Sequence, residues 1–294
     1  MFIFMVQRSF PYPIEMKYFF RLYLLLFPLT VNAQLSAKFD RKTMLFAGSP
    51  VEQARYLLRP VLIQAQLGPP LISLPPVLQK VLTNEIAPPV TEKIKAYLVR
   101  EKIAINAIGG DPDLAMSKNV NGVTANYFVI HDTSTPLYPK TFPLDIDQPA
   151  WKYNNFALLK GTEAHVFVNR AGGSLTQNDF NVPWRATKLE SKVLGLVSRG
   201  NFIHIELIMP RRSDPNYRQA DAVAPVPGFT KPQLKRLALL YVIASARKHA
   251  WLVPVYHAVL DEGISDGHDD PQHFDLNEWS EQIGVVLAEI NEGV

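Results

Sequence analysis

The sequence predicts an α/β domain built around one β-sheet and preceded by a helical, proline-rich extension. From Asn126 onward, short runs rich in Val, Ile and Phe alternate with longer helical patterns, which is the element order of α/β proteins. Ahead of that region the composition differs, because eight of the 24 prolines fall between Pro50 and Pro89. A chain of 294 residues with 47% hydrophobic residues can bury a sizeable core.

The N-terminus has the composition of an export signal. Two basic residues, Lys17 and Arg21, precede an apolar run that extends to Val31, and a small-residue cleavage motif ends at Ala33. A membrane anchor is the alternative interpretation, but a span needs about 20 apolar residues and this run has roughly half of that. We therefore expect residues 1–33 to be a signal peptide, with Met16 as an alternative start. The mature protein is expected to be periplasmic or secreted, without a stable membrane anchor.

Charge and cysteine content exclude some partners and some kinds of site. The formal net charge is +3, and no basic cluster of the kind that follows phosphates is present, so no nucleic acid partner is expected. The chain contains no cysteine, which excludes disulfides. Any transition-metal site must therefore use nitrogen and oxygen donors.

Residues 34–110 are expected to form a helical extension packed on the main domain. Paired prolines at positions 69–70, 75–76 and 88–89 stop helices, and short helical patterns lie between them. The segment carries too many Leu, Ile and Val residues to remain a solvated linker. The predicted helices are Val51 to Leu67, Val77 to Glu85 and Val90 to Ile103.

Three strands and two further helices can be placed after the extension. The strands are short apolar or alternating runs, Tyr127 to His131, Ala164 to Asn169 and Asn201 to Ile208. The helix Thr230 to Ala250 opens with the letters TKPQ, in which Thr and Gln are spaced to cap each other's backbone donors. The helix Asp275 to Ile290 begins beside Phe274 and Trp279, which are placed to form a hydrophobic staple.

The segment HAVLDEGISDGHDDPQHF, from His257 to Phe274, gathers many potential metal ligands. It contains three of the seven histidines and four aspartates: His257, His268, His273, Asp261, Asp266, Asp269 and Asp270. Imidazole and carboxylate are good zinc ligands, and His131 at the end of a predicted strand is the best outlying partner. A calcium site made from the four aspartates is the alternative, but it would leave His131 and His257 without a role.

Glu206 lies within a predicted strand, FIHIEL. Alternation of side chains places Phe202, His204 and Glu206 on one face of that strand. A carboxylate there is costly to bury unless it meets a cation, a hydrogen-bond donor or a metal-bound water. A salt bridge with Arg211 or Arg212 is the alternative interpretation.

Four segments together resemble a known family. YFVIHDTS, AHVFVNRAGG, FIHIEL and HAVLDEGISDGHDDPQHF occur in the order seen in the zinc-dependent N-acetylmuramoyl-L-alanine amidases of the type 2 family, which shares its fold with animal peptidoglycan recognition proteins. The resemblance covers about residues 120 to 290, within an expected domain of residues 111–294. It implies a central mixed β-sheet flanked by helices. It also implies hydrolysis of the amide bond between N-acetylmuramic acid and L-alanine in peptidoglycan or muropeptides.

The resemblance implies the ligands of one zinc ion. They are His131, His257 and Asp270. The interval between His257 and Asp270 is longer than is usual in the family, so the same loop offers rival candidates for the third ligand: His268, Asp266 and Asp269.

The resemblance also implies catalytic roles. Glu206 matches the general base, which would take a proton from the attacking water and pass it to the departing amide nitrogen. His268 stands where many members have a lysine that stabilises the transition state, and His165 is expected to be structural. A non-catalytic peptidoglycan-binding module of the same fold is the alternative function. The presence of three candidate ligands together with Glu206 argues against it.

Overall fold

The centre of the fold is a five-stranded β-sheet, seen in a computed structural model that describes residues 39–159, 164–217 and 222–292. The strand order is β10 (Val253–Tyr256), β3 (Tyr127–Asp132), β7 (Phe202–Leu207), β5 (Val166–Val168) and β6 (Ser174–Thr176). The first four strands are parallel and β6 is antiparallel to β5. The predicted α/β class, a mixed sheet flanked by helices, is confirmed at this level. The predicted signal peptide and Met16 lie outside the described residues.

The three predicted strands are present in the central sheet, and its other two strands were not predicted. Strands β3, β5 and β7 begin and end within two residues of the predicted bounds. Strand β10 contains Pro254, which removes a backbone donor and argues against a strand in sequence reasoning. Its position at the edge of the sheet explains why proline is tolerated there. Strand β6 has only three residues, which is too short to give a clear alternating pattern.

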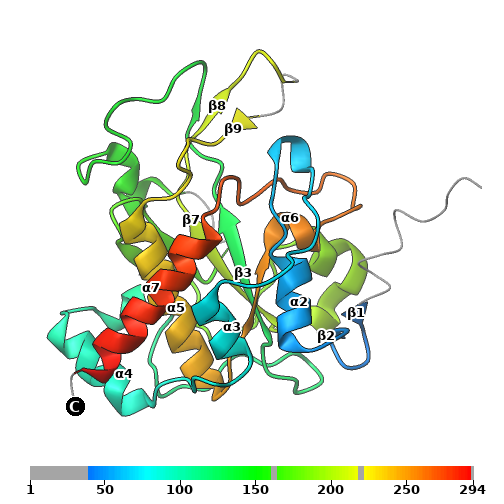
Figure 1. Cartoon of the computed structure of the whole chain (residues 1–294), viewed down its shortest axis with the longest axis vertical. Coiled ribbons are helices and arrows are strands. Elements are labelled where there is room, and N and C mark those ends of the chain that lie inside the picture. The colour runs from blue at the N-terminus through cyan, green and yellow to red at the C-terminus, as the bar shows by residue number, and fades with distance from the viewer. Residues whose placement is uncertain (1–38, 160–163, 218–221, 293–294) are drawn as a thin grey trace, which may run out of the picture.

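Two helices form successive layers on one face of the sheet (Figure 1). They are α5 (Lys231–Lys248) and α7 (Leu276–Asn291), and α5 lies between the sheet and α7. Tyr241 of α5 shows this order, because its ring centroid lies 5.3 Å from Phe128 of β3 and 5.3 Å from Trp279 of α7. A helix covered on both sides must be apolar around most of its circumference, which is why α5 buries nearly all of its central residues.

Both predicted helix starts are confirmed. Thr230 and Gln233 form a capping box at the start of α5, with each side chain bonding the other's backbone N–H group. The side chain of Asp275 accepts a hydrogen bond from the backbone N–H of Glu278 at the start of α7. Phe274 and Trp279 pack edge to face with ring centroids 5.9 Å apart, which fixes the end of the preceding loop against the helix.

The extension contributes three helices, α2 (Pro50–Leu57), α3 (Pro76–Leu82) and α4 (Thr91–Arg100). The first was predicted to continue to Leu67 but ends ten residues earlier, because Pro60 cannot continue a helix and disfavours helical backbone before it. Helix α2 packs against β10, and α3 and α4 pack against α7. Side chains from both sides of residue 110 belong to one hydrophobic core. A domain boundary at that position stays a prediction.

The remaining elements are short. Strands β1 (Phe39–Asp40) and β2 (Leu45–Phe46) form a hairpin, and β4 (Leu137–Tyr138), β8 (Arg211–Ser213) and β9 (Ala222–Val223) form a small separate sheet. Helical turns occur at α6 (His257–Leu260) and η5 (Leu189–Leu194), and also at Ile63–Ala65, Ile105–Ala107, Lys152–Asn154, Phe156–Leu158 and Gly195–Ser198. Among the described residues, no helix has the length and apolar content needed to cross a membrane.

Candidate metal centre

Three neighbouring parallel strands deliver the candidate site residues to one edge of the sheet. His131 lies near the end of β3, directly opposite Glu206 of β7 in the strand register. His257 follows β10 on the other side of β3 and begins α6 (Figure 1). Crevices beyond the carboxyl ends of parallel strands are common ligand-binding positions in open α/β sheets, so this edge is a natural place for a site.

His131, His257 and Asp270 form a compact buried group. The Nδ1 atoms of the two histidines lie 2.9 Å apart. The Asp270 carboxylate lies 3.1 Å from Nδ1 of His257 and 4.0 Å from Nδ1 of His131. Two nitrogen ligands of a tetrahedral zinc ion are about 3.4 Å apart, so these spacings suit a shared ion. The three residues could hold a metal ion, and the geometry alone does not select which one.

Backbone contacts hold Asp270 in this position. The backbone N–H of Asp132 donates a hydrogen bond of 3.0 Å to Oδ2 of Asp270. The backbone N–H of Ala258 donates to the carbonyl oxygen of Asp270 at 2.9 Å. The carboxylate is therefore fixed between β3 and α6, and Asp270, rather than His268, Asp266 or Asp269, is grouped with both histidines.

The electrostatics of the two histidines differ. Burial and the neighbouring His257 hold the pKa of His131 well below its usual range. Burial alone would lower the pKa of His257, but the carboxylates of Asp270 and Asp261 outweigh it and raise that pKa to about 10. Metal binding at Nδ1 of His257 must therefore displace a proton.

Asp261 supports His257 from the side opposite to the site. Oδ2 of Asp261 lies 3.0 Å from Nε2 of His257, and Oδ1 accepts a hydrogen bond from the backbone N–H of Leu189 at 3.0 Å. Metal-binding histidines usually donate their other ring N–H group to such a carboxylate. Although Asp261 is buried, its pKa lies below the usual range because His257 and His268 bond to it.

Glu206 lies beside the group. Its Oε1 atom is 3.8 Å from Nδ1 of His131, and its side chain is 13% exposed against 0% for His131 and 4% for Asp270, so it lies on the more exposed side of the centre. The two arginines considered as alternative partners form ion pairs with other carboxylates. Arg211 pairs with Asp132 at 2.8 Å, and Arg212 pairs with Asp214 at 2.9 Å.

His268 lies at the rim of the site. Its ring stacks on His257 with centroids 4.1 Å apart, and its Nδ1 atom lies 2.8 Å from Oδ2 of Asp261. Its side chain is 45% exposed. His257, Asp261 and His268 form a second group with ligand atoms close together. Because one Asp261 oxygen meets both imidazoles, this second group has the arrangement of a carboxylate that orients two histidines.

The other candidates of the loop lie apart from the buried group. Asp266 is exposed and pairs with Lys192, and Asp269 accepts a hydrogen bond from Gln272. His273 contacts the carbonyl oxygen of Pro225 through Nδ1. Among the described residues the four aspartates of the loop form no common group, which argues against the calcium alternative.

Two buried residues behind His131 were not predicted as part of the site. Nε2 of His131 lies 3.0 Å from Nδ1 of His204, and Nε2 of His204 lies 3.2 Å from Oε2 of Glu190. Strand alternation had placed His204 on the same face as Glu206, which was a usable signal. Nothing in the local sequence pattern marked Glu190.

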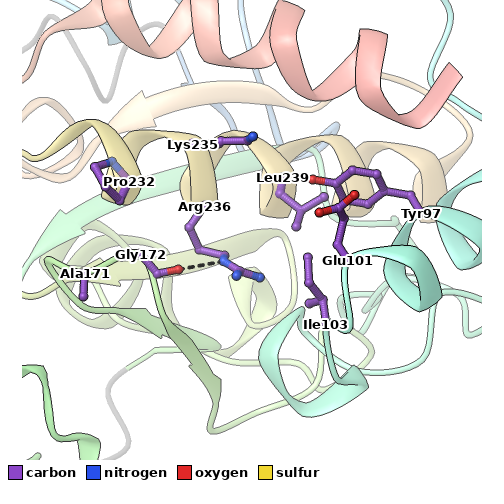
Figure 2. A pocket seen from close by; sticks show the side chains of 9 residues that line it. All are labelled: Tyr97, Glu101, Ile103, Ala171, Gly172, Pro232, Lys235, Arg236 and Leu239. Atoms are coloured by element: carbon purple, nitrogen blue, oxygen red, sulfur yellow. Dashed lines mark hydrogen bonds between the residues drawn. The ribbon is translucent and has the colours of Figure 1, made fainter. Parts of the chain in front are cut away.

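A separate hollow of about 270 Å³ lies where the extension meets α5 and the turn after β5 (Figure 2). Nε of Arg236 donates a hydrogen bond to the carbonyl oxygen of Gly172 there, as the dashed line in Figure 2 marks. Lys235 at its edge forms an ion pair with Glu289. The lining contains no histidine and no nucleophile next to a base, so its chemistry does not compete with that of the metal centre.

Comparison with known proteins adds no assignment. The chain matches no protein-family model, no curated protein and no solved structure.

Proposed function

We propose that the protein is a zinc-dependent N-acetylmuramoyl-L-alanine amidase with the type 2 amidase fold. The observation that carries the proposal is the buried group of His131, His257 and Asp270 with Glu206 on its more exposed side. Two histidines and one carboxylate are a donor set of catalytic zinc sites, which keep a further position for water. Three of the four sequence segments that resemble this family contribute these same residues, and the predicted export signal would bring the enzyme to peptidoglycan.

In the proposed reaction the chain's own residues move protons and position the substrate. A zinc ion held by the three ligands would lower the pKa of a coordinated water to about 7 and polarise the scissile carbonyl. Glu206 accepts a proton from the attacking water and delivers it to the amide nitrogen of L-alanine as that bond breaks. His268 at the rim donates a hydrogen bond to the carbonyl oxygen as it gains negative charge.

Product analysis tests this function directly. The purified protein is incubated with muropeptides, with and without a chelator, and the products are weighed by mass spectrometry. We expect release of the free stem peptide from the glycan, loss of this activity on chelation, and its return when zinc is added. Binding of muropeptides without release would identify a recognition module instead. Release that is insensitive to chelation would rule out a metal-dependent amidase.

A substitution of Glu206 tests the general base. Glu206→Gln keeps the shape of the side chain but cannot accept the proton, so we expect stoichiometric zinc with a rate lower by about 10²- to 10⁴-fold. Glu281→Gln, on the exposed face of α7, is the matched control and should leave the rate unchanged. Near-normal turnover by Glu206→Gln would assign Glu206 a structural role.

A further inference from the structure

Behind His131, a chain of buried polar side chains runs away from the metal centre. His131, His204 and Glu190 all have side chains with no exposed area. Nε2 of His131 contacts Nδ1 of His204 at 3.0 Å, and Nε2 of His204 lies 3.2 Å from Oε2 of Glu190. Nδ1 of His204 is therefore engaged by His131, and Nε2 of His204 faces the Glu190 carboxylate at ion-pair distance without an aligned hydrogen bond.

The Glu190 carboxylate determines which ring nitrogens of His204 and His131 donate and which accept. Oε2 of Glu190 accepts hydrogen bonds from the backbone N–H groups of Ala186 and Thr187 and from Oγ1 of Thr187, at 3.1, 3.2 and 3.0 Å. Because a lone pair on Nε2 would face this acceptor oxygen at 3.2 Å, the neutral ring of His204 carries its proton on Nε2 and accepts at Nδ1. Nε2 of His131 must then donate to His204. Nδ1 of His131 is then the ring nitrogen that carries the lone pair, and it faces Nδ1 of His257 at 2.9 Å and the Asp270 carboxylate.

We infer that Glu190 and His204 are positioning residues that lock His131 in the tautomer that presents Nδ1 to the metal. This inference rests on the metal centre of the proposed function and extends it to residues that touch neither metal nor substrate. The other histidine ligand, His257, has a similar support, because a carboxylate oxygen of Asp261 lies 3.0 Å from its Nε2 atom.

One helical turn connects the two supports. Turn η5 supplies Glu190 to the chain behind His131, and the backbone N–H of the preceding residue, Leu189, donates to Asp261 behind His257. Consecutive residues of η5 thus contact both supporting systems. A displacement of this turn would disturb the two histidine ligands together.

A purely structural role is a weaker explanation for the buried contact between Glu190 and His204. Oε1 of Glu190 and Nε2 of His204 are both buried without an aligned hydrogen-bond partner, and buried polar atoms in that state are costly. Apolar side chains of similar volume commonly fill such positions at equal or better stability. The placement of a buried acid against His204 is therefore better explained by the proton position that it imposes on His131.

His165 provides a matched control within the same layer of the core. It is also fully buried, and its ring stacks on His204 with centroids 5.7 Å apart. Its Nδ1 atom accepts from the backbone N–H of His204, and its Nε2 atom contacts the carbonyl oxygen of Val182. Its ring makes two hydrogen bonds, and neither leads to His131.

Measured zinc affinity distinguishes a positioning role of His204 from a purely structural one. We expect His204→Phe to weaken zinc binding by about 10- to 100-fold, measured by competition with a chelator, and Glu190→Gln to weaken it less. His165→Phe should lose similar stability in urea unfolding yet keep the wild-type affinity. The absorption spectrum of bound Co²⁺ should change in His204→Phe alone. Equal loss of zinc affinity in the two phenylalanine variants would overturn the inference.

A second measurement needs no variant. Long-range ¹H–¹⁵N NMR of the metal-free wild-type protein, with labelled histidine, reports which ring nitrogen carries the proton. We expect His131 and His204 protonated at Nε2, and a proton on Nδ1 of neutral His131 would refute the inference. A protein that binds zinc with these tautomers but releases no stem peptide would sink the proposed function alone. A wild-type protein that binds no zinc would overturn both.

Discussion

Removal of Asp270 is the sharpest test of the metal centre. Its carboxylate lies 3.1 Å from Nδ1 of His257 and accepts a hydrogen bond from the backbone N–H of Asp132, so Asp270→Ala deletes the acceptor that joins β3 to α6. At free zinc 100-fold above the dissociation constant, the wild-type protein should gain about 2.7 kcal/mol of stability. For a chain of this size, that corresponds to a rise in Tm of about 5 to 11 °C.

The variant should lose almost all of this gain. Loss of a residue that merely orients a ligand costs about 10- to 100-fold in metal affinity, and loss of a ligand should cost at least the upper value. At the same free zinc concentration the gain then falls to about 0.4 kcal/mol or less, a rise in Tm below about 2 °C. The assay is thermal unfolding in buffered zinc and in chelator. Asp269→Ala, at the adjacent carboxylate outside the group, should keep the full rise. A full rise in Asp270→Ala would refute the ligand assignment.

Two further outcomes follow from contacts near and far from the site. His268→Ala should retain stoichiometric zinc and lose about 10²-fold or more in rate, because it removes an oxyanion donor and no ligand; a zinc-free variant would make His268 a ligand. Burial lowers the pKa of Lys248 to about 8, so between pH 8 and the unfolded value of 10.5 the unfolded state binds more protons and stability rises with pH. Lys248 alone should therefore contribute a gain of about 2 kcal/mol between pH 7 and 9.5, at about 1.36 kcal/mol per unit above pH 8, measured in urea unfolding as the difference between the wild type and Lys248→Met. Other titrating groups such as His257 are present in both proteins and cancel in that difference. The exposed Lys140→Met should keep the wild-type pH dependence; a Lys248→Met protein with the wild-type pH dependence would contradict the reasoning.

Local pattern was sufficient to predict the parts of the fold in which sequence and packing agree. Strands β3, β5 and β7 are buried on both faces and are read as short runs of Val, Ile and Phe. The start of α5 has a capping box that is visible in four letters. Strand β10 was missed because Pro254 opposes a strand assignment, and only its edge position in the assembled sheet makes that residue acceptable.

The candidate site likewise contains residues that local sequence pattern predicts and residues that only the assembled fold brings into contact. His131, His257 and Asp270 stand out because ligand types cluster in the sequence or at the end of a strand, and the structure brings those three together. Glu190 and His204 could not be predicted as support for His131 in that way. Their role depends on a contact between a helical turn and a strand that are separated along the chain, and on the rule that a carboxylate can only accept.

A buried carboxylate in a helical turn also has an ordinary explanation at the level of sequence. Glu190 could have faced solvent or capped its own turn, and it does accept hydrogen bonds from Thr187. Only the fold shows that the same oxygen also meets His204, whose other nitrogen meets a candidate metal ligand. The proton that each ring carries is thereby determined by a residue two contacts away from His131. For this reason the tautomer of His131, more than the count of ligands, is the property by which the proposed centre can be tested before any substrate is known.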